Sequence, residues 1–540
     1  MTLFHDLLQE HVFSVETADG RRVRTSLPGL LAGLTRDEVL DQPAVRPYQQ
    51  HVWHAFLVQL AALHLVRSGE GAMPEDEDGW RAALMALTPE ASDGAAWCLV
   101  TSPDRPAFLQ PPVPGEAISG FKEVLTPDAL DMLVTSRNHD VKQCAVLAAQ
   151  VEHWVLALVS VQTQEGYMGP GYYGISRMNG GYSSRPALSV SAGERPGLRF
   201  ARDCRRMVAA RAELLRQNPH YPSKGGMALL WGAPWDGTTQ LSLSDLDPFY
   251  IEVCRRIRLV QDAAGRLTAR QGTSKVARVD AKGVAGNTGD GWTPLIPSGE
   301  GLKALSVTRE SFRYDKLSAL IFPSPSDPNA AVRAPLQVVA SDDPASGLTM
   351  VFRGLVRGQG KTEGYFERHI PVSRTMRGFL RESATDRAAA AAAERVADAG
   401  LMARKVLYPA LLSVFTAAPG ESERTRDDQS AKDRAGRGVE RFHAAVDAGF
   451  FLALDTELAS SNPEETRAAR VDWVRSLADA ARGVLAEVAA EAPAAAMRHY
   501  RTRARSRDRL EWALRRHFGG YLGAAGIGLE APVVQQVEEG

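Results

Sequence analysis

The sequence changes character near Pro371. Residues before it mix short apolar runs with frequent glycine and proline, whereas residues after it are rich in alanine and follow a helical period. That period predicts four long helices, two of which start at Pro463 and Pro493, where proline is well tolerated. The predicted helices span Ser373–Val414, Val439–Ala459, Glu464–Ala492 and Ala494–Leu522. Between the first two, the charged segment Gly420–Gly438 predicts a solvated linker, so residues 373–540 are expected to form a four-helix bundle.

Residues 1–372 are expected to form a large mixed α/β domain. The predicted helices are two apolar segments, Val52–Val66 and Cys144–Gln162, and the amphipathic Leu198–Gln217. Phe249–Asp290 is expected to be strand-rich, and Leu348–Val356 to form a buried strand. The predicted fold class is therefore α+β, a mixed N-terminal domain followed by a helical bundle.

Composition limits the classes of function. The net charge of −1 gives no global basic field, so any contact with nucleic acid must come from local patches. Four scattered cysteines without a CxxC pair argue against a disulfide framework and against a cysteine zinc site, and favour the cytoplasm. The N-terminus lacks the basic start of a secretory signal, and the apolar runs are too short for a bilayer. We expect no metal, no cofactor and no membrane contact.

Two short motifs imitate nucleotide-binding sites. Gly169, Gly171 and Gly174 form a GxGxxG, but Pro170 and the tyrosines that follow disfavour the helix that a dinucleotide fold requires. The segment Gly358–Thr362 spells GQGKT after a strand, but position 355 is leucine where a P-loop needs glycine. A P-loop-like nucleotide hydrolase using GQGKT is nevertheless kept as the alternative function.

Histidine and serine patterns do not suggest an enzyme. His51 and His54 lie on one side of an apolar helix without an HExxH pattern, and His64 is more typical of a satisfied core residue. No GxSxG nucleophile elbow occurs. We therefore expect a protein without a catalytic centre.

Several segments, in their order along the chain, resemble the CasA family, the large subunit of the type I-E CRISPR Cascade complex. The segment from Phe4 to Leu34 resembles its opening strand–turn–strand–helix, and Arg357–Val372 resembles its wedge hairpin. Between them lie Phe108–Gln110, the turn Thr135–Lys142, an apolar helix and a glycine loop that ends in Asn179-Gly180-Gly181. The C-terminal bundle completes the family's two-domain layout.

The resemblance implies a non-catalytic, DNA-binding role. In that family, a glycine loop lies against the minor groove of the protospacer-adjacent motif, a lysine finger reaches the same groove, and a glutamine wedge starts strand separation. The implied glycine loop consists of Gly169, Gly171, Tyr172, Tyr173 and Gly174. The implied wedge consists of Gly358, Gln359, Gly360 and Lys361, and the finger is either Lys275 or Lys282.

Glycines let backbone approach a narrow groove, and a slim polar tip on a stiff strand suits a wedge. The tyrosines are expected either to flank sugars or to pack the loop. In the family, the loop holding Asn138, His139 and Asp140 contacts the complex near the guide RNA's 5′ handle; Asn138 or Asp140 would equally suit a helix N-cap.

Arginines offer further contacts to the DNA backbone. Arg353 and Arg357 flank the implied wedge, and Arg498, Arg501, Arg505 and Arg509 recur at helical spacing on one face of the last helix. The alternative for that face is simple solvation.

The implied partners are CRISPR RNA, double-stranded target DNA, a helicase-nuclease, and the backbone, small and 5′-handle-binding subunits. A helical scaffold without DNA contact is the remaining alternative.

Overall fold

A computed structural model describes residues 4–132, 149–262, 264–299, 301–358, 361–381, 386–416, 429–492 and 496–524. It divides into two compact units. Unit 1 comprises Met1–Phe312, Asn329–Val372 and Leu380–Glu382; unit 2 comprises Arg313–Pro328, Ser373–Phe379 and Ser383–Gly540. The first is mixed helix and strand and the second is helical, which confirms the predicted fold class.

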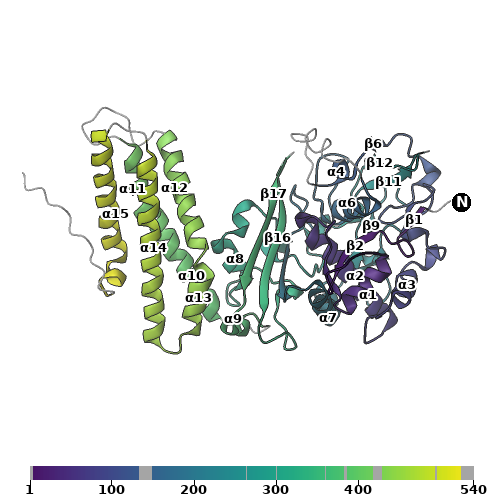
Figure 1. Cartoon of the computed structure of the whole chain (residues 1–540), viewed down its shortest axis with the longest axis horizontal. Helices are drawn as coiled ribbons and strands as arrows, with labels where there is room; N and C mark the ends of the chain where they lie inside the picture. Colours follow the sequence, from purple (N-terminus) through teal and green to yellow (C-terminus); the bar gives the residue numbers. More distant parts are fainter. Residues whose placement is uncertain are drawn as a thin grey trace, which may run out of the picture. The chain divides into compact units, whose positions relative to one another are not determined.

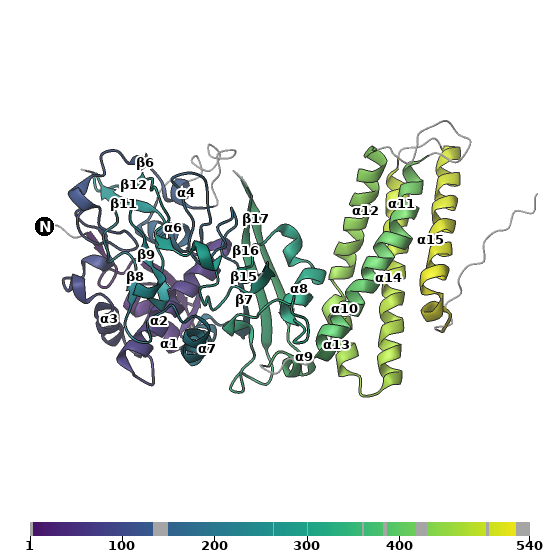
Figure 2. The same cartoon turned by 180° about the vertical axis from the view of Figure 1, so that it is seen from behind.

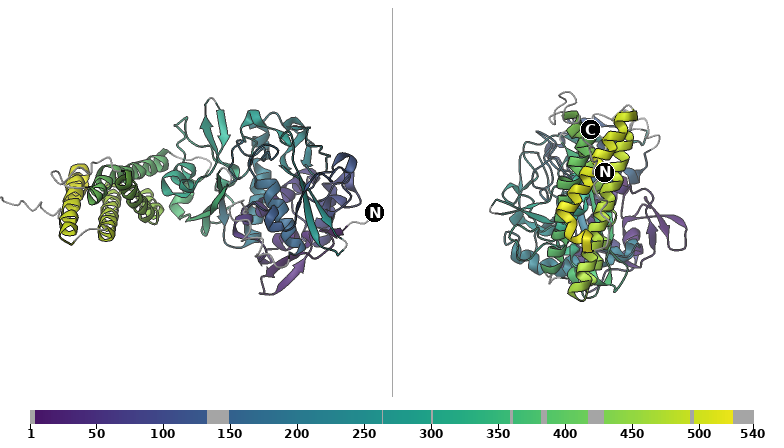
Figure 3. Two further views of the ribbon diagram at one scale, coloured as in Figure 1. Left: turned by 90° about the horizontal axis from the view of Figure 1, so that it is seen from above. Right: turned by 90° about the vertical axis from the view of Figure 1, so that its left-hand side faces the viewer.

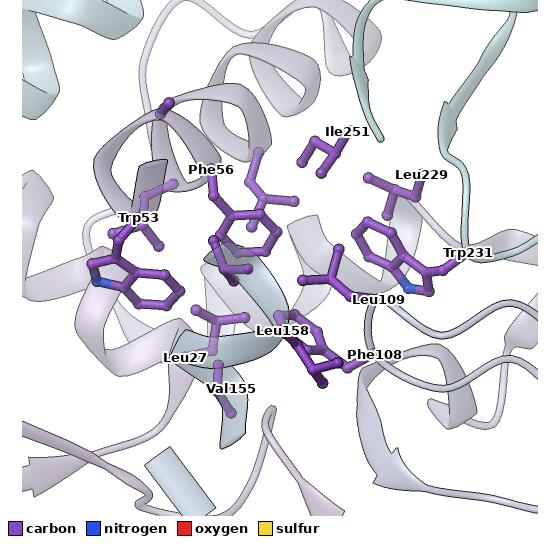
Figure 4. Close-up of a cluster of buried hydrophobic side chains, with 14 of the residues drawn as sticks. Leu27, Trp53, Phe56, Phe108, Leu109, Val155, Leu158, Leu229, Trp231 and Ile251 are labelled. Atoms are coloured by element: carbon purple, nitrogen blue, oxygen red, sulfur yellow. The ribbon is translucent and has the colours of Figure 1, made fainter. Parts of the chain in front are cut away.

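Unit 1 is organised around buried helices and an aromatic core. Its α-helices are α1 (Leu27–Thr35), α2 (Gln50–Ser68), α3 (Glu77–Ala86), α4 (Pro127–Leu130), α6 (Val151–Gln164) and α7 (Pro196–Gln217). Trp53 of α2 stacks on Phe56 at 5.6 Å between ring centroids, and Phe56 meets Phe108 edge-on (Figure 4). Trp231 lies edge-on to Trp97 beside them. Because α2 is apolar on most sides, it is buried nearly all round, as the sequence predicted for 52–66.

The strands of unit 1 form several small sheets. The opening strand–turn–strand–helix is present as β2 (Phe13–Thr17), β3 (Arg22–Thr25) and α1, with β4 (Val39–Asp41) on the other side of β2. The region expected to be strand-rich contains β10 (Leu246–Ile251), β11 (Arg256–Gln261), β12 (Leu267–Gly272) and β13 (Val279–Asp280). The remaining short strands are β1 (Phe4–Asp6), β5 (Cys98–Val100), β6 (Lys122–Val124), β8 (Met227–Leu229), β9 (Leu241–Ser242), β14 (Leu295–Ser298) and β15 (Gly301–Ala304).

The two longest strands, β16 and β17, form one antiparallel sheet with β7, in the order β17-β16-β7. Its members are β7 (Ala187–Ala192), β16 (Leu348–Gly358) and β17 (Lys361–Pro371), and β16 and β17 run side by side as a long hairpin in Figures 1 and 2. The predicted buried strand 348–356 is thus confirmed and extended by two residues.

Unit 2 is built from long helices. They are α10 (Asp386–Leu401), a π-helical turn (Met402–Leu407), α11 (Tyr408–Phe415), α12 (Gln429–Asp447), α13 (Phe450–Ala459), α14 (Pro463–Glu491) and α15 (Ala496–Ala524), with the short α8 (Tyr314–Ile321) and α9 (Arg374–Phe379). Helices α11, α12, α14 and α15 lie side by side in Figures 1 and 2, and Figure 3 views several of them nearly end-on. A helical bundle over this region agrees with the sequence pattern.

The predicted linker Gly420–Gly438 is wrong over its second half, because α12 already begins at Gln429. Ala431, Ala435, Gly438 and Phe442 recur at helical spacing and are buried, although the residues between them are charged. A Cβ on Gly438 would lie 2.7 Å from Leu411 of α11, so this glycine permits close helix approach and does not mark a loop.

Other helix boundaries also differ from those predicted from the sequence. The predicted helix 373–414 begins instead with the separate α9, and the predicted helix 439–459 is divided between α12 and α13 next to Gly449. Of the predicted helix 144–162, residues 144–148 lie outside the described residues, and α6 spans Val151–Gln164.

Candidate nucleic-acid interface

The glycine loop, residues 166–181, folds back so that its two ends lie next to each other. Tyr167 N–H donates to the Gly181 carbonyl at 3.0 Å, and Glu165 and Ser184 form a β-bridge just outside the loop. At the tip, Tyr172 N–H donates to the Gly169 carbonyl at 3.0 Å. The loop follows helix α6 and opens no helix, so the GxGxxG is not a dinucleotide fingerprint.

The glycines of this loop are required for two different reasons. Gly169 and Gly171 have φ of +126° and +86°, a region that side chains disfavour. Gly174 instead lies directly against the backbone of Gly166, which leaves no room for a Cβ. The missing side chain of Gly174 is therefore required for packing inside the loop, a reason that the expected approach to DNA did not include.

The loop tyrosines pack on each other and stay half-exposed. Tyr167 contacts Tyr173 and Tyr182 at ring-centroid distances of 5.9 and 5.6 Å. Tyr172 lies under the guanidinium of Arg255, 6.0 Å from the ring centroid. Packing accounts for part of these rings, and their exposed parts remain available to a ligand.

The structure distinguishes the two lysine candidates. Ser274 N–H donates to the Gly171 carbonyl at 3.1 Å, and the exposed Lys275 is the next residue. A Cβ on Gly171 would lie only 2.9 Å from the Cβ of Thr273. Lys282, also exposed, is in the 3₁₀ turn Lys282–Val284. Lys275 therefore belongs to the neighbourhood of the glycine loop through a direct backbone contact.

The hairpin β16–β17 carries the implied wedge. Its register pairs Gly358 with Lys361, and a bulge lies between Val356 and Arg357. Gln359 and Gly360, which fall between the paired residues, and the side chain of Lys361 lie outside the described residues. Because Lys361 begins a strand and not a helix, GQGKT does not form a P-loop.

Arg353 and Arg357, expected to contact phosphates, are both paired with carboxylates of the chain itself. Arg357 is 7% exposed and pairs with Glu165 at 2.8 Å. Arg353 pairs across the hairpin with Glu367 at 2.8 Å. Although burial alone would raise the pKa of Glu367, Arg353 and the neighbouring His369 and Tyr365 lower it to about 2. Both arginines neutralise internal carboxylates, which removes them from the set of free surface cations.

Glu165 is the centre of a buried ion cluster that the sequence did not reveal. Its second oxygen accepts from Arg255 at 2.7 Å, and Arg255 also donates to the Gly166 carbonyl at 3.0 Å. Burial would raise the pKa of Glu165, but the guanidiniums of Arg255 and Arg357 outweigh it and hold that pKa below its usual range. The glycine loop and the hairpin thus meet at one ionised carboxylate.

The implied guide-RNA loop, with Asn138, His139 and Asp140, lies outside the described residues. The chain leading into it is firmly held. Asp131 accepts from Tyr48 at 3.0 Å, Gln49 at 2.6 Å and Ser160 at 3.1 Å. Thr362 of β17 donates to the Met132 carbonyl at 3.1 Å. The hairpin is therefore bonded to the start of this segment as well.

The arginines of α15 do not act alike. Arg501 and Arg509 are exposed, whereas Arg505 donates to the carbonyls of Ser413 at 2.5 Å and Thr416 at 2.6 Å, at the end of α11. The side chain of Arg498 lies outside the described residues. Arg505 caps a helix and leaves the expected DNA-facing row.

Helix α15 also presents features that the arginine spacing did not predict. Tyr500 and Trp512 are 78% and 57% exposed. A groove of about 840 Å³ between α14 and α15 is lined by Tyr500, Arg503, Arg507 and apolar residues of α14. These positions on α15 are identified by the exposure of their side chains in the structure, and not by the helical spacing of the arginines.

The described part of the chain offers neither a metal centre nor a membrane helix. No group of three or more His, Cys, Asp or Glu side chains there is suited to a metal ion. Likewise, none of its helices is long and apolar enough to cross a membrane.

Cys98, Cys204 and Cys254 are buried free thiols, and Cys144 lies outside the described residues. His51 is buried, which lowers its pKa to about 3, so it serves as a neutral core residue.

Comparison with known proteins identifies the fold. No family model matches the sequence, and no curated protein matches it either. Among solved structures, CasA from Thermus thermophilus is similar over 95% of this chain and 100% of its own, with a TM-score of 0.63 at 16% identity. Cse1 from Acidimicrobium ferrooxidans is similar over 96% of this chain and 99% of its own, with a TM-score of 0.63 at 16% identity. A chain of a CRISPR RNA-guided surveillance complex is similar over 94% of this chain and 100% of its own, with a TM-score of 0.57 at 14% identity.

Proposed function

We propose that this chain, which has the CasA fold, is a non-catalytic subunit of a CRISPR RNA-guided surveillance complex. In this role it recognises a short flanking motif in double-stranded DNA, opens the adjacent duplex for guide pairing and recruits a helicase-nuclease. Its other partners are the CRISPR RNA and the backbone, small and 5′-handle-binding subunits. One observation carries the proposal: the glycine loop, the Lys275 segment and the hairpin are joined by direct bonds.

The loop and Lys275 would contact the minor groove together. That groove is about 6 Å wide and presents a degenerate pattern of acceptors, so it admits thin backbone and a long cationic side chain. Positive φ at Gly169 and Gly171 forms the thin tip, and Lys275 supplies the positive charge beside it.

Gln359 would then separate the first base pair. Unstacking a base step costs a few kcal/mol, and guide pairing replaces the lost DNA pairing in a nearly balanced exchange. A hairpin of eleven-residue strands gives such a wedge a stiff support, and this mechanism needs no ATP.

Motif recognition is tested by comparing Lys275→Ala with Lys282→Ala in the assembled complex. Lys275→Ala is expected to weaken binding of motif-containing duplex by roughly tenfold, while Lys282→Ala leaves it within about twofold. The reverse order of effects would assign the finger to Lys282. No motif dependence in the unmodified complex would contradict the proposed function itself.

Strand opening is tested by Gln359→Ala on fully paired targets and on targets already unpaired at the first guide-matched positions. The variant is expected to open paired DNA slowly and to bind pre-opened DNA almost normally, because the opening cost is then absent. Lys361→Ala, two residues further along the chain at the start of β17, is the matched change and should have the smaller effect. Equal loss on both targets for Gln359→Ala would exclude the wedge.

Surface charge supports weaker contacts. The exposed Arg501 and Arg509 would bind phosphates, and Asn138, His139 and Asp140 would contact the guide RNA's 5′-handle region. Because the basic patches are local, the isolated chain should bind duplex DNA weakly and with strong salt dependence. Tight motif discrimination by the chain alone at physiological salt would contradict the subunit role.

A further inference from the structure

Both ends of the glycine loop are bonded to the same short stretch of strand β16. Before the loop, the Glu165 carboxylate accepts from Arg357 at 2.8 Å. After the loop, the Ser184 hydroxyl donates to the carbonyl of Leu355. Leu355 and Arg357 are alternate residues of one strand, which ends at Gly358, the residue paired with Lys361 of β17.

The two ends are also bonded to each other. Glu165 and Ser184 form a β-bridge, and the Glu165 carbonyl accepts from Ile175 N–H of the loop at 2.9 Å. Arg255 spans the same junction, since it pairs with the Glu165 carboxylate and donates to the Gly166 carbonyl. Loop and strand are therefore cross-linked at a junction composed of Glu165, Ser184, Arg255, Leu355 and Arg357.

This junction is unusual in its burial and charge. Arg255 is 2% exposed, and Glu165 and Arg357 are each 7% exposed. Two guanidiniums share one carboxylate, so the cluster carries a net positive charge inside the protein. Such a cluster costs desolvation energy, and well-packed apolar side chains would hold two segments together at lower cost. Directional bonds add what apolar packing lacks, namely a fixed register between the segments.

We propose that Glu165, Arg357 and Ser184 are positioning residues that couple motif recognition to strand opening. They hold the hairpin at a fixed offset from the glycine loop, so that a loop seated in the groove places the hairpin turn at the first base pair to be opened. This inference rests on the proposed function. It adds that the two DNA-contacting elements act as one body, and that β16 is the link between them.

Arg357→Met is the most informative variant. Methionine retains the apolar stem of the side chain, and Glu165 keeps its pairing with Arg255, so the loop end of the junction stays neutralised. Arg353→Met is the matched control: it lies on the same strand and also pairs with a carboxylate, but that partner, Glu367, belongs to the hairpin and not to the loop.

The experiment uses the assembled complex and a fluorescent base analogue at the first guide-matched pair. Arg357→Met is expected to slow opening of paired, motif-containing DNA by about tenfold or more, because small misplacements of an acting group have large rate effects. Its binding to pre-opened DNA should stay within about twofold of the unmodified complex. Arg353→Met should stay within about twofold on both targets. Equal slowing by Arg353→Met would overturn the proposal, since the effect would then be general loosening of the hairpin.

A double variant tests whether Arg357 acts through the hairpin turn. If it does, Arg357→Met combined with Gln359→Ala should open paired DNA no more slowly than Gln359→Ala alone, within about twofold. Multiplication of the two single effects would mean independent actions and would overturn the coupling.

Ser184→Ala keeps the test decisive if Arg357→Met fails to fold or assemble. It removes the other bond to β16 and leaves the ion cluster intact. Slower opening that is restored on pre-opened DNA supports the proposal, while unchanged opening, or equal loss on both targets, overturns it. The unmodified complex and Gln359→Ala are measured in the same series. If opening by the unmodified complex does not depend on the motif, the proposed function fails; if it does depend on it, only the coupling is at stake.

Discussion

The arginines around the glycine loop and those of helix α15 have the same chemistry and opposite surroundings. Arg255 and Arg357 are buried against Glu165, whereas Arg501 and Arg509 are exposed. In the first region the charge fixes the relative position of two backbone segments. In the second it is available to a partner. From the sequence, Arg357 beside the implied wedge and Arg501 on the last helix had the same expected role, so burial, and not residue type, separates a structural cation from a binding cation.

The largest expected effect comes from removing the buried carboxylate. Glu165→Gln leaves two buried guanidiniums without an ionised partner, so we expect a loss of about 3–5 kcal/mol in the free energy of unfolding. Urea titration measures it. The control is Glu213→Gln on α7, where the ion pair with Arg216 is exposed and no measurable change is expected. Similar losses in both variants would erase the contrast between buried and exposed pairs.

Asp131 sharpens the comparison because it is a buried carboxylate held by neutral donors. Burial raises its pKa to about 6, against an ordinary value of 3.8. Between these values the folded state binds more protons than the unfolded chain, so stability is greatest below this window and falls by about 3 kcal/mol as pH rises through it. Glu165, whose pKa is lowered, contributes in the opposite sense and loses stability as pH falls.

Unfolding free energies at pH 4, 5, 6 and 7 measure this slope. Asp131→Asn cannot ionise, so its curve should lack the fall between pH 4 and 6. An unchanged slope in the variant would show that another group titrates there.

Within α15, Arg505 and Arg509 provide a matched pair one helical turn apart. Arg505→Ala removes two charge-assisted bonds to the carbonyls that end α11, so we expect a loss of about 1.5–3 kcal/mol. Arg509→Ala should change the free energy of unfolding by no more than about 0.5 kcal/mol, because its side chain is exposed. If urea titration shows equal losses in the free energy of unfolding for both variants, Arg509 also has a structural role.

The smallest effect on stability should accompany a clear effect on DNA binding. Arg501→Ala combined with Arg509→Ala should leave folding nearly unchanged but make the slope of log K against log salt less negative by about 1.8, if each arginine neutralises one phosphate. Arg475→Ala, an exposed arginine on α14, is the control and should leave the slope unchanged. An unaltered slope in the double variant would show that Arg501 and Arg509 do not contact DNA and are simply solvated.

Local pattern predicted the elements that carry their own signal. Helix α2 and strand β16 could be predicted because each is buried on most sides. Such burial requires a nearly continuous apolar sequence, without alternating polar residues. The start of α12 was missed because its buried face consists of alanines and one glycine among charges, which local rules assign to solvent. Similarly, Gly174 was assigned to ligand access because sequence cannot show that Gly166 occupies the space beside it.

The sequence by itself determined the α+β class, the helical C-terminal region, the candidate glycine loop and the strand beneath the implied wedge. Only the tertiary structure decided which charges are free. Glu165 and Arg357 are 192 residues apart along the chain, and no local period relates them. Lys275 was likewise preferred over Lys282 by a single backbone bond between Ser274 and Gly171. The physical reason is common to both cases: helical and strand periods encode which face of an element is apolar, whereas the partner of a charged side chain is set by how distant elements meet.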